Sequence, residues 1–294
     1  MRKTVVLFLS ILILLLGILV SCSGEGVVDE AFTATVTFNG NGATSGSMAA
    51  QKVGRGSDTR LEANAFEKTF YRFTGWNTES DGSGTAYTEG QIINAKENIT
   101  LYAQWELDAV VLTSSTKYWT DGNAYTLNSD VTIDDWVSVT GNVALILPDG
   151  YTLTASNGIV VTEGNSLTIN GEGSGTLIST GGGGCAGIGG WIDNENHDCG
   201  NITINGGTVN ATSINGGAGI GGGVNGSGGN ITINGGTVTA GSSYLGAAGI
   251  GKGAGGTDDG TLALGDGITL KVSDDNIYWS DYDGTTRERY MKTV

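Results

Sequence analysis

A ten-residue string occurs twice without change in the second half of this 294-residue chain. It spans Gly200–Val209, reads Gly-Asn-Ile-Thr-Ile-Asn-Gly-Gly-Thr-Val, and returns 29 positions later at Gly229–Val238. Diverged copies begin at Ser166 and Gly260, and an Ala-Gly-Ile-Gly element follows at Ala186, Ala218 and Ala248. A period of this length is typical of solenoids, and short alternating runs with Asn-Gly turns favour a β-solenoid over a helical one.

The repeat predicts how successive coils stack. Ile202 and Ile204 should point inward, with Ile231 and Ile233 directly on them in the next coil. Asn205 and Asn234 should stack in the same way, so that their amides can form a ladder of hydrogen bonds between coils. The turn after each asparagine needs positive φ, which glycine supplies.

Looser strands of the same spacing extend this region toward the N-terminus. They include Val131-Thr132-Ile133, Val143–Leu147 and Gly158–Val161. We therefore predict a right-handed β-solenoid over residues 108–272. The glycine pattern ends near Ser273, and residues 273–294 are predicted to form a cap that covers the last coil and blocks edge pairing.

The residues before the solenoid alternate with period two. Ala34–Phe38 and Ile99–Trp105 have this pattern, and glycine-rich turn clusters lie between them at Asn39–Gly42 and Asp81–Gly84. A segment with few aliphatic residues needs aromatic side chains for its core. We therefore expect Trp76 and Trp105 to be core residues rather than a platform for sugar rings.

Residues 32–107 resemble the Listeria/Bacteroides repeat, also known as the internalin-type B repeat. The matching pieces, in order, are Val36–Asn39 with its glycine-rich turn, Tyr71–Asn77, Gly82–Thr85, Tyr87 and Leu101–Trp105. The resemblance implies a small β-grasp-like domain of bacterial surface proteins without catalytic residues. Such modules often occur in tandem, whereas this chain has a single copy, which favours a spacer or adaptor role.

The second half resembles the glycine-rich, carbohydrate-binding-type β-helix repeats of secreted bacterial proteins. Its signature is the Asn-Ile-Thr-Ile-Asn-Gly-Gly-Thr-Val string followed by Ala-Gly-Ile-Gly-Gly. This signature is informative about the fold and poorly informative about a ligand. The overall prediction is a mainly β protein: a small β-grasp-like domain followed by a right-handed β-solenoid.

The first 22 residues resemble a bacterial lipoprotein signal peptide. Arg2 and Lys3 precede an apolar run from Thr4 to Val20, and Leu19–Cys22 has the form of a lipobox. The resemblance implies cleavage before Cys22 and acylation of that residue. Residues 1–21 would then be the leader and residues 22–31 a tether. A single transmembrane helix is the alternative, since about 20 apolar residues span a bilayer.

Acidic residues dominate the predicted solenoid. The chain has a net charge of −16. Between positions 109 and 286 there are seventeen acidic residues and only three basic ones, all lysines. Nucleic acid and anionic lipid need clustered Lys or Arg, so both are poor partners for this surface. Glycans, cationic surfaces or divalent cations fit better.

Three cysteines have different expected fates. Acylation of Cys22 would leave Cys185 and Cys199 as the two remaining thiols. Two cysteines in an exported chain commonly form a disulfide. A disulfide between them is our expectation. Two buried free thiols are the first alternative, and metal ligation beside His197 and Asp198 is the second, although the CxxC spacing of structural zinc sites is absent.

Catalytic motifs find little support in the sequence. A lyase needs several basic residues, and the solenoid has only three lysines and no arginine. His197 has no recognisable triad partner. Hydrolysis needs two carboxyl groups, one with a raised pKa, and the acidic loops look solvated. The densest oxygen cluster contains Asp193, Glu195 and Asp198, which makes them weak calcium candidates without an EF-hand pattern. No other cofactor is expected.

We therefore expect a lipid-anchored protein of the cell envelope, at the outer membrane or cell surface. It would act as a non-catalytic adhesin or glycan-contacting module, with glycans or a host surface as its partner. Trp119, Trp136 and Trp191 are the candidates for sugar stacking. The alternatives are a polysaccharide hydrolase that uses the Asp193–Asp198 loop and a passive spacer. An ice-facing surface would need regular Thr rows on successive coils, of which Thr203 aligned with Thr232 is one pair, and we favour it less than these alternatives.

Overall fold

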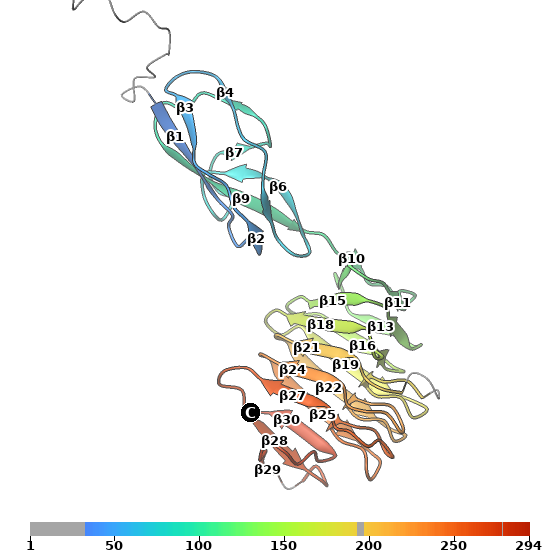
Figure 1. The fold of residues 1–294 in the computed structure, drawn as a ribbon. Helices are drawn as coiled ribbons and strands as arrows, with labels where there is room; N and C mark the ends of the chain where they lie inside the picture. The colour runs from blue at the N-terminus through green and yellow to red at the C-terminus, as the bar shows by residue number, and fades with distance from the viewer. Residues whose placement is uncertain (1–32, 193–196, 278) are drawn as a thin grey trace, which may run out of the picture. The chain divides into compact units, whose positions relative to one another are not determined.

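The computed structural model describes residues 33–192, 197–277 and 279–294 (Figure 1). Within these residues there are only strands, turns and loops, and no helix. The chain divides into two compact units. The first holds residues 33–69 and Phe73–Glu106, and the second holds Phe70–Arg72 and Leu107–Val294.

The first unit is built on a five-stranded mixed sheet. Its strands are β1 (Thr33–Asn39), β2 (Ser45–Gly46), β3 (Gln51–Gly54), β4 (Thr59–Arg60), β5 (Phe66–Glu67), β6 (Tyr71–Asn77), β7 (Ala86–Tyr87), β8 (Ile92–Ile93) and β9 (Ile99–Leu107). The sheet order is β3-β1-β9-β6-β7, with β1 and β9 parallel at its centre. This central pair is the arrangement of a β-grasp, but no helix crosses the sheet among the described residues.

Aromatic side chains form the core of the first unit. Trp76 is 1% exposed and contacts Phe38 and Phe73, with ring centroids 4.9 and 5.0 Å apart. Trp105 packs against Phe73 at 5.7 Å and donates from Nε1 to the carbonyl oxygen of Gly40 at 2.9 Å. Both tryptophans are therefore core residues, as predicted.

The second unit is a solenoid of three parallel sheets that the chain visits in turn (Figure 1). Sheet I contains β10 (Val110–Val111), β12 (Ala124–Thr126), β15 (Asn142–Leu147), β18 (Ser166–Gly171), β21 (Asn201–Ile204), β24 (Asn230–Ile233) and β27 (Thr261–Leu264). Sheet II contains β13 (Val131–Ile133), β16 (Thr152–Ala155), β19 (Thr176–Gly181), β22 (Thr208–Ser213) and β25 (Thr237–Ser242). Sheet III contains β11 (Tyr118–Trp119), β14 (Val137–Val139), β17 (Ile159–Val160), β20 (Ile188–Gly189), β23 (Ile220–Gly221) and β26 (Ile250–Gly251). The β-solenoid is confirmed, while its handedness stays a prediction.

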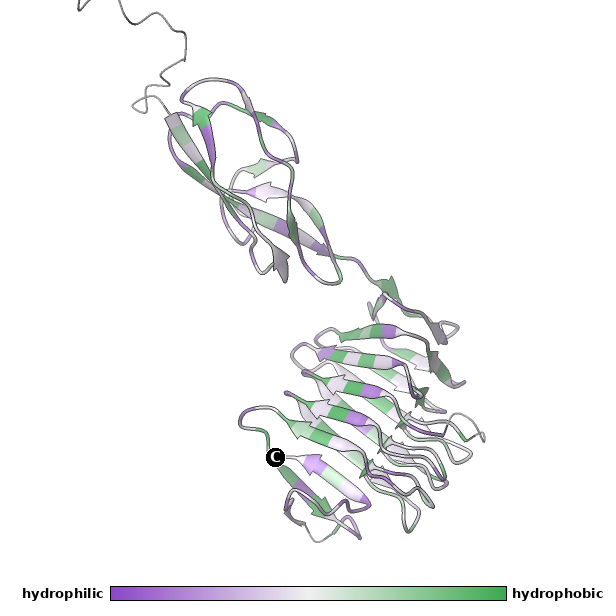
Figure 2. Ribbon diagram, in the orientation of Figure 1, coloured by the Kyte–Doolittle hydropathy of each residue, from purple (hydrophilic) through white to green (hydrophobic). Residues whose placement is uncertain are grey.

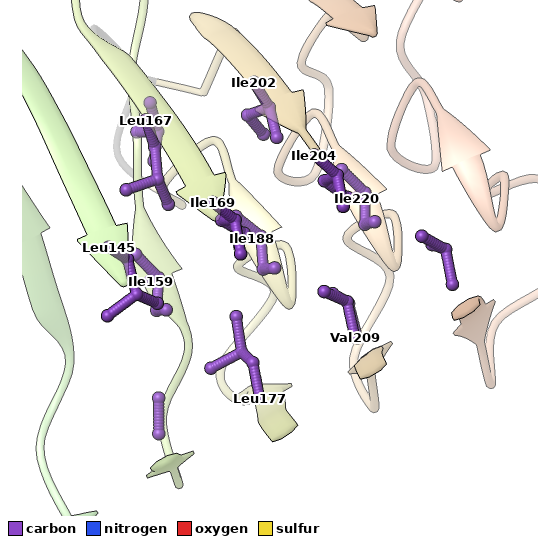
Figure 3. Packing of buried hydrophobic residues seen from close by; sticks show 14 of the residues in the cluster. Leu145, Ile159, Leu167, Ile169, Leu177, Ile188, Ile202, Ile204, Val209 and Ile220 are labelled. Carbon is purple, nitrogen blue, oxygen red and sulfur yellow. The ribbon is translucent and has the colours of Figure 1, made fainter. Parts of the chain in front are cut away.

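Aliphatic columns fill the solenoid interior. Ile202 pairs with Ile231 and Ile204 with Ile233, and all four are at most 1% exposed, so the predicted stacking is confirmed. In Figure 3, Ile169, Leu177 and Ile188, one from each sheet of a single coil, point into the same interior. Figure 2 shows the resulting alternation of hydrophobic and polar residues along the strands of sheet I. Burying each such side chain stabilises the fold by about 1.5–3 kcal/mol.

The predicted asparagine ladder is present on the outer face of sheet I. Asn234 Nδ2 donates to Asn205 Oδ1, and Asn205 Nδ2 donates to Asn170 Oδ1, both at 2.9 Å. A second ladder runs along the same sheet, where Asn230 Nδ2 donates to Asn201 Oδ1 at 2.9 Å. Amides on this face therefore satisfy one another from coil to coil.

The two glycines of each Asn-Gly-Gly turn have different roles. Gly207 and Gly236, the second glycine in each turn, have φ of 81° and 85°. At Gly206 a Cβ would lie 2.7 Å from the carbonyl oxygen of Gly171 in the preceding coil. The positive φ predicted for this turn therefore falls on the second glycine, while the first permits close approach of two backbones.

The C-terminal strands depart from the parallel pattern. They are β28 (Leu270–Ser273), β29 (Ser280–Asp281) and β30 (Tyr290–Thr293). Strand β30 pairs antiparallel with β25 and with β28, and Met291 is fully buried in the solenoid core. These strands end the parallel growth of sheet II, which is the function expected of a cap.

Candidate functional site

Trp119 is a core residue and not a ligand platform. Its side chain is 0% exposed and stacks on Tyr125, with centroids 5.2 Å apart and an interplanar angle of 19°. Its Nε1 donates to the carbonyl oxygen of Thr116 at 3.0 Å. The prediction of sugar stacking at Trp119 is therefore wrong: Trp119 is the inward residue of β11, and its neighbour Tyr118, 63% exposed, is the outward one.

Trp136 and Trp191 form an aromatic pair on the surface of sheet III. Trp136 directly precedes β14 and is 38% exposed, and Trp191, half-buried, follows β20 two coils further along. Their ring centroids lie 5.3 Å apart with an interplanar angle of 53°. Two of the three tryptophans selected from the sequence are thus brought together.

The pair borders a shallow depression of about 300 Å³. Its other lining residues are Ser138, Val139, Thr140, Val160, Thr162 and Asn165. Asn165 is held in place because its Nδ2 donates to Thr162 Oγ1 at 3.1 Å and its Oδ1 accepts from the Gly141 amide at 2.8 Å. The lining thus combines two indole rings with hydroxyl and amide groups, which is the chemistry that polyhydroxylated ligands use.

A basic residue flanks the aromatic pair. Lys117 Nζ lies 5.0 Å from the centroid of the Trp136 ring and forms an ion pair with Asp135. The hydrogen bond between the two side chains raises the pKa of Lys117 and lowers the pKa of Asp135. Asp135 is therefore a poor general acid, while Lys117 is oriented over the indole ring.

Cys185 and Cys199 are both buried and neither is in a disulfide, so the expected disulfide is wrong. Cys185 lies in the corner between β19 and β20, whereas Cys199 lies in the next corner, between β20 and β21. A strand of sheet III thus separates the two residues, and Cys199 belongs to the interior of the solenoid. Burial raises the pKa of the Cys199 thiol, which disfavours the reactive thiolate.

The weak calcium candidates receive no support from the described part of the loop. Asp193 and Glu195 lie outside the described residues. Asp198 Oδ1 accepts from the Ser227 amide at 2.6 Å and lies 4.0 Å from His197 Nε2. Among the residues that the structure describes, no group of three or more His, Cys, Asp or Glu side chains is placed to hold a metal ion.

Comparison with protein families supports both sequence resemblances. Residues 35–104 match the Listeria-Bacteroides repeat domain, and residues 202–224 and 231–251 match the family described as Beta helix repeat. The chain carries a Listeria-Bacteroides repeat domain followed by β-helix repeats. No solved structure matches the chain.

One curated relative shares a short stretch with this protein. It is described as a Gly-rich membrane protein of Evansella cellulosilytica and is 55% identical over 42 residues. That stretch covers 14% of this chain and 5% of the relative. The Listeria-Bacteroides repeat domain is typical of cell-surface proteins, and the two findings together indicate a surface-type β-helix repeat protein.

The leader and Cys22 lie outside the described residues. Within residues 33–192, 197–277 and 279–294, no helix is long and apolar enough to cross a membrane.

Sequence reasoning missed several residues of the β-helix surface. Lys117 and Tyr118 precede Trp119, and only the alternation along β11 shows that Tyr118 faces outward. Thr162 and Asn165 have no motif of their own and join the depression because their corner follows β17.

Proposed function

We propose that this protein is a lipid-anchored, non-catalytic adhesin or glycan-contacting module of the bacterial cell envelope. Acylated Cys22 would hold it at the outer membrane or cell surface, the Listeria-Bacteroides repeat domain would act as a spacer, and the β-helix would contact the glycan. The observation that carries the proposal is the Trp136–Trp191 pair in one depression with hydroxyl and amide groups.

The chemistry of the depression fits a neutral glycan. The indole faces can stack on the apolar faces of sugar rings, and the hydroxyls of Ser138, Thr140 and Thr162 can exchange hydrogen bonds with sugar hydroxyls. Lys117, beside the aromatic pair, can donate a hydrogen bond to an acceptor atom of the ligand. A second candidate, a hydrolase that uses the Asp193–Asp198 loop, has no comparable observation in its favour.

A glycan-array screen tests the proposal. Residues 23–294 contain every strand of the described structure and would be assayed with and without calcium, for binding and for released sugar. We expect binding without release, and loss of binding in the double variant W136A/W191A. The matched control is Tyr151→Ala, which removes an aromatic side chain of similar exposure, 37%, from elsewhere on the solenoid. Equal binding by the double variant and the wild type, or no binding to any glycan, would contradict the proposal, and released sugar would support the hydrolase.

The anchor needs its own test. Cells that express the full chain would be labelled with a radioactive fatty acid, and the wild-type protein should take up label that Cys22→Ala does not. Label of equal strength in the variant would contradict acylation at Cys22.

A further inference from the structure

The outer face of sheet II carries threonines in register. Thr152 pairs with Thr176, Thr176 with Thr208, and Thr208 with Thr237, which makes one column across four coils. The perfect repeats align Thr208 with Thr237 as well as Thr203 with Thr232. The strand register extends the first of these pairs into a regular Thr row on sheet II.

Further outward residues extend this column into a grid. The second column contains Thr132, Thr154, Ile178, Asn210 and Thr239. The third contains Thr180, Thr212 and Gly241. In a parallel sheet, neighbouring strands lie about 4.8 Å apart and alternate residues of one strand about 6.6 Å apart, so the hydroxyls repeat in two directions. We call these three columns the threonine grid.

The threonine grid is uncharged, although the chain has a net charge of −16. Its members other than the buried Gly241 are half-buried or exposed, so the face is open to solvent. Charged side chains appear only beyond it, such as Lys292, which pairs with Thr239 from β30. A charged partner would find no complementary group on this face.

Most hydroxyls of the grid are available to a ligand. For Thr208, Thr237 and Thr239 the described structure contains no side-chain hydrogen-bond partner, and Thr212 Oγ1 reaches Thr180 Oγ1 only at 3.4 Å. On sheet I, in contrast, the asparagine amides bond to one another, and only a single threonine column, with Thr203 at its centre, lies between the two ladders. Threonine is restricted at χ1, so its hydroxyl is held in position before a ligand arrives.

We propose that the threonine grid binds the surface of ice. Each threonine hydroxyl can both donate and accept a hydrogen bond, as a water molecule can. Only a ligand with its own two-dimensional order can engage all three columns at once, and an ice face is neutral and offers oxygen atoms at regular intervals. A crystalline polysaccharide is less suited, because the three columns contain no aromatic side chain for stacking on sugar rings.

Ice-affinity adsorption of residues 23–294 tests this inference. The protein would be incubated with a slowly growing ice shell, and the fraction in ice compared with that of a solute of similar size. Thr208→Tyr places a bulky ring in the first column of the grid, and Thr203→Tyr is the matched control on sheet I. Tyrosine is favoured in strands, so both variants should fold, which circular dichroism would check.

We expect the wild type and Thr203→Tyr to be enriched in ice and Thr208→Tyr to be excluded. No enrichment of the wild type, or equal enrichment of both variants, would overturn the inference. Binding of the wild type to crystalline cellulose or chitin but not to ice would also overturn it. Because Trp136 and Trp191 lie on sheet III, Thr208→Tyr should leave glycan binding unchanged, so failure here is distinguishable from failure of the proposed function.

Discussion

The two units of this protein build their interiors in different ways. The Listeria-Bacteroides repeat domain gathers aromatic rings around Trp76 from its own strand β6 and from β1 and β5. The β-helix stacks small aliphatic side chains, such as Ile204 on Ile169 and Ile233, and repeats this contact from coil to coil. Because aliphatic columns fill the interior of the β-helix, its tryptophans are not all needed there, and Trp136 and Trp191 lie on the surface.

Removal of the central ring should have the largest effect. Trp76→Ala is expected to destabilise the Listeria-Bacteroides repeat domain by about 3–5 kcal/mol, because the cavity lies where three phenylalanines meet. Calorimetry should show the transition of this domain shifted and that of the β-helix unmoved. Trp191→Ala is the control and should shift neither transition. A common shift of both transitions would show that the two units do not unfold separately.

A cavity in the aliphatic column should act more locally. Ile204→Ala is expected to lower the free energy of unfolding of the β-helix by about 2–5 kcal/mol. In a repeat structure each coil contacts its neighbours, so amide exchange should accelerate most in β18, β21 and β24. The outward substitution Thr203→Ala on the same strand is the control. Uniform acceleration through all coils would contradict nearest-neighbour stabilisation.

The asparagine ladder should contribute less than the column beneath it. Asn205→Ala removes the hydrogen bonds to Asn170 and Asn234 and is expected to cost about 0.5–1.5 kcal/mol, since the ladder is exposed. Asn210→Ala, on sheet II and outside both ladders, should cost less in the same urea titration. A larger loss at Asn210 would contradict the ladder's role.

The smallest expected effect depends on pH. The amides of Thr285 and Thr286 donate to Asp283 at 2.8 and 2.7 Å and lower the pKa of its carboxyl group. A lowered pKa stabilises the folded cap at pH values above the unfolded value of 3.8, and this contribution disappears as the pH falls below it. Thermal melts of the wild type and Asp283→Asn should therefore differ at neutral pH and converge in acid. A difference that stays constant down to about pH 2 would contradict this assignment.

The fold could be predicted where a local pattern repeats. The spacing of Gly200–Val209 and Gly229–Val238 was sufficient to stack Ile202 on Ile231 and Asn205 on Asn234, because identical coils align without a choice of register. The tryptophans of the Listeria-Bacteroides repeat domain could be assigned to the core because few aliphatic residues were available there.

Features that depend on unequal coils could not be predicted. The steps from Thr152 to Thr176, to Thr208 and to Thr237 are 24, 32 and 29 residues, so no fixed period reveals the column. Trp119 is buried and Trp136 is exposed because of where each lies relative to the interior of the first coils, which no repeat of the sequence indicates. The disulfide was expected from an even count of cysteines, which says nothing about the corners of the coil on which they lie.

The central claim is that Trp136 and Trp191 bind a ligand, whereas Trp76 stabilises the fold of its domain. The most direct test measures glycan affinity by calorimetric titration and the melting temperature of both transitions for W136A/W191A and for W76A. We predict that W136A/W191A loses the heat of binding with both transitions unchanged, and that W76A keeps the affinity while the transition of its own domain shifts. Unchanged binding in W136A/W191A, or binding lost only together with the β-helix transition, would contradict the claim.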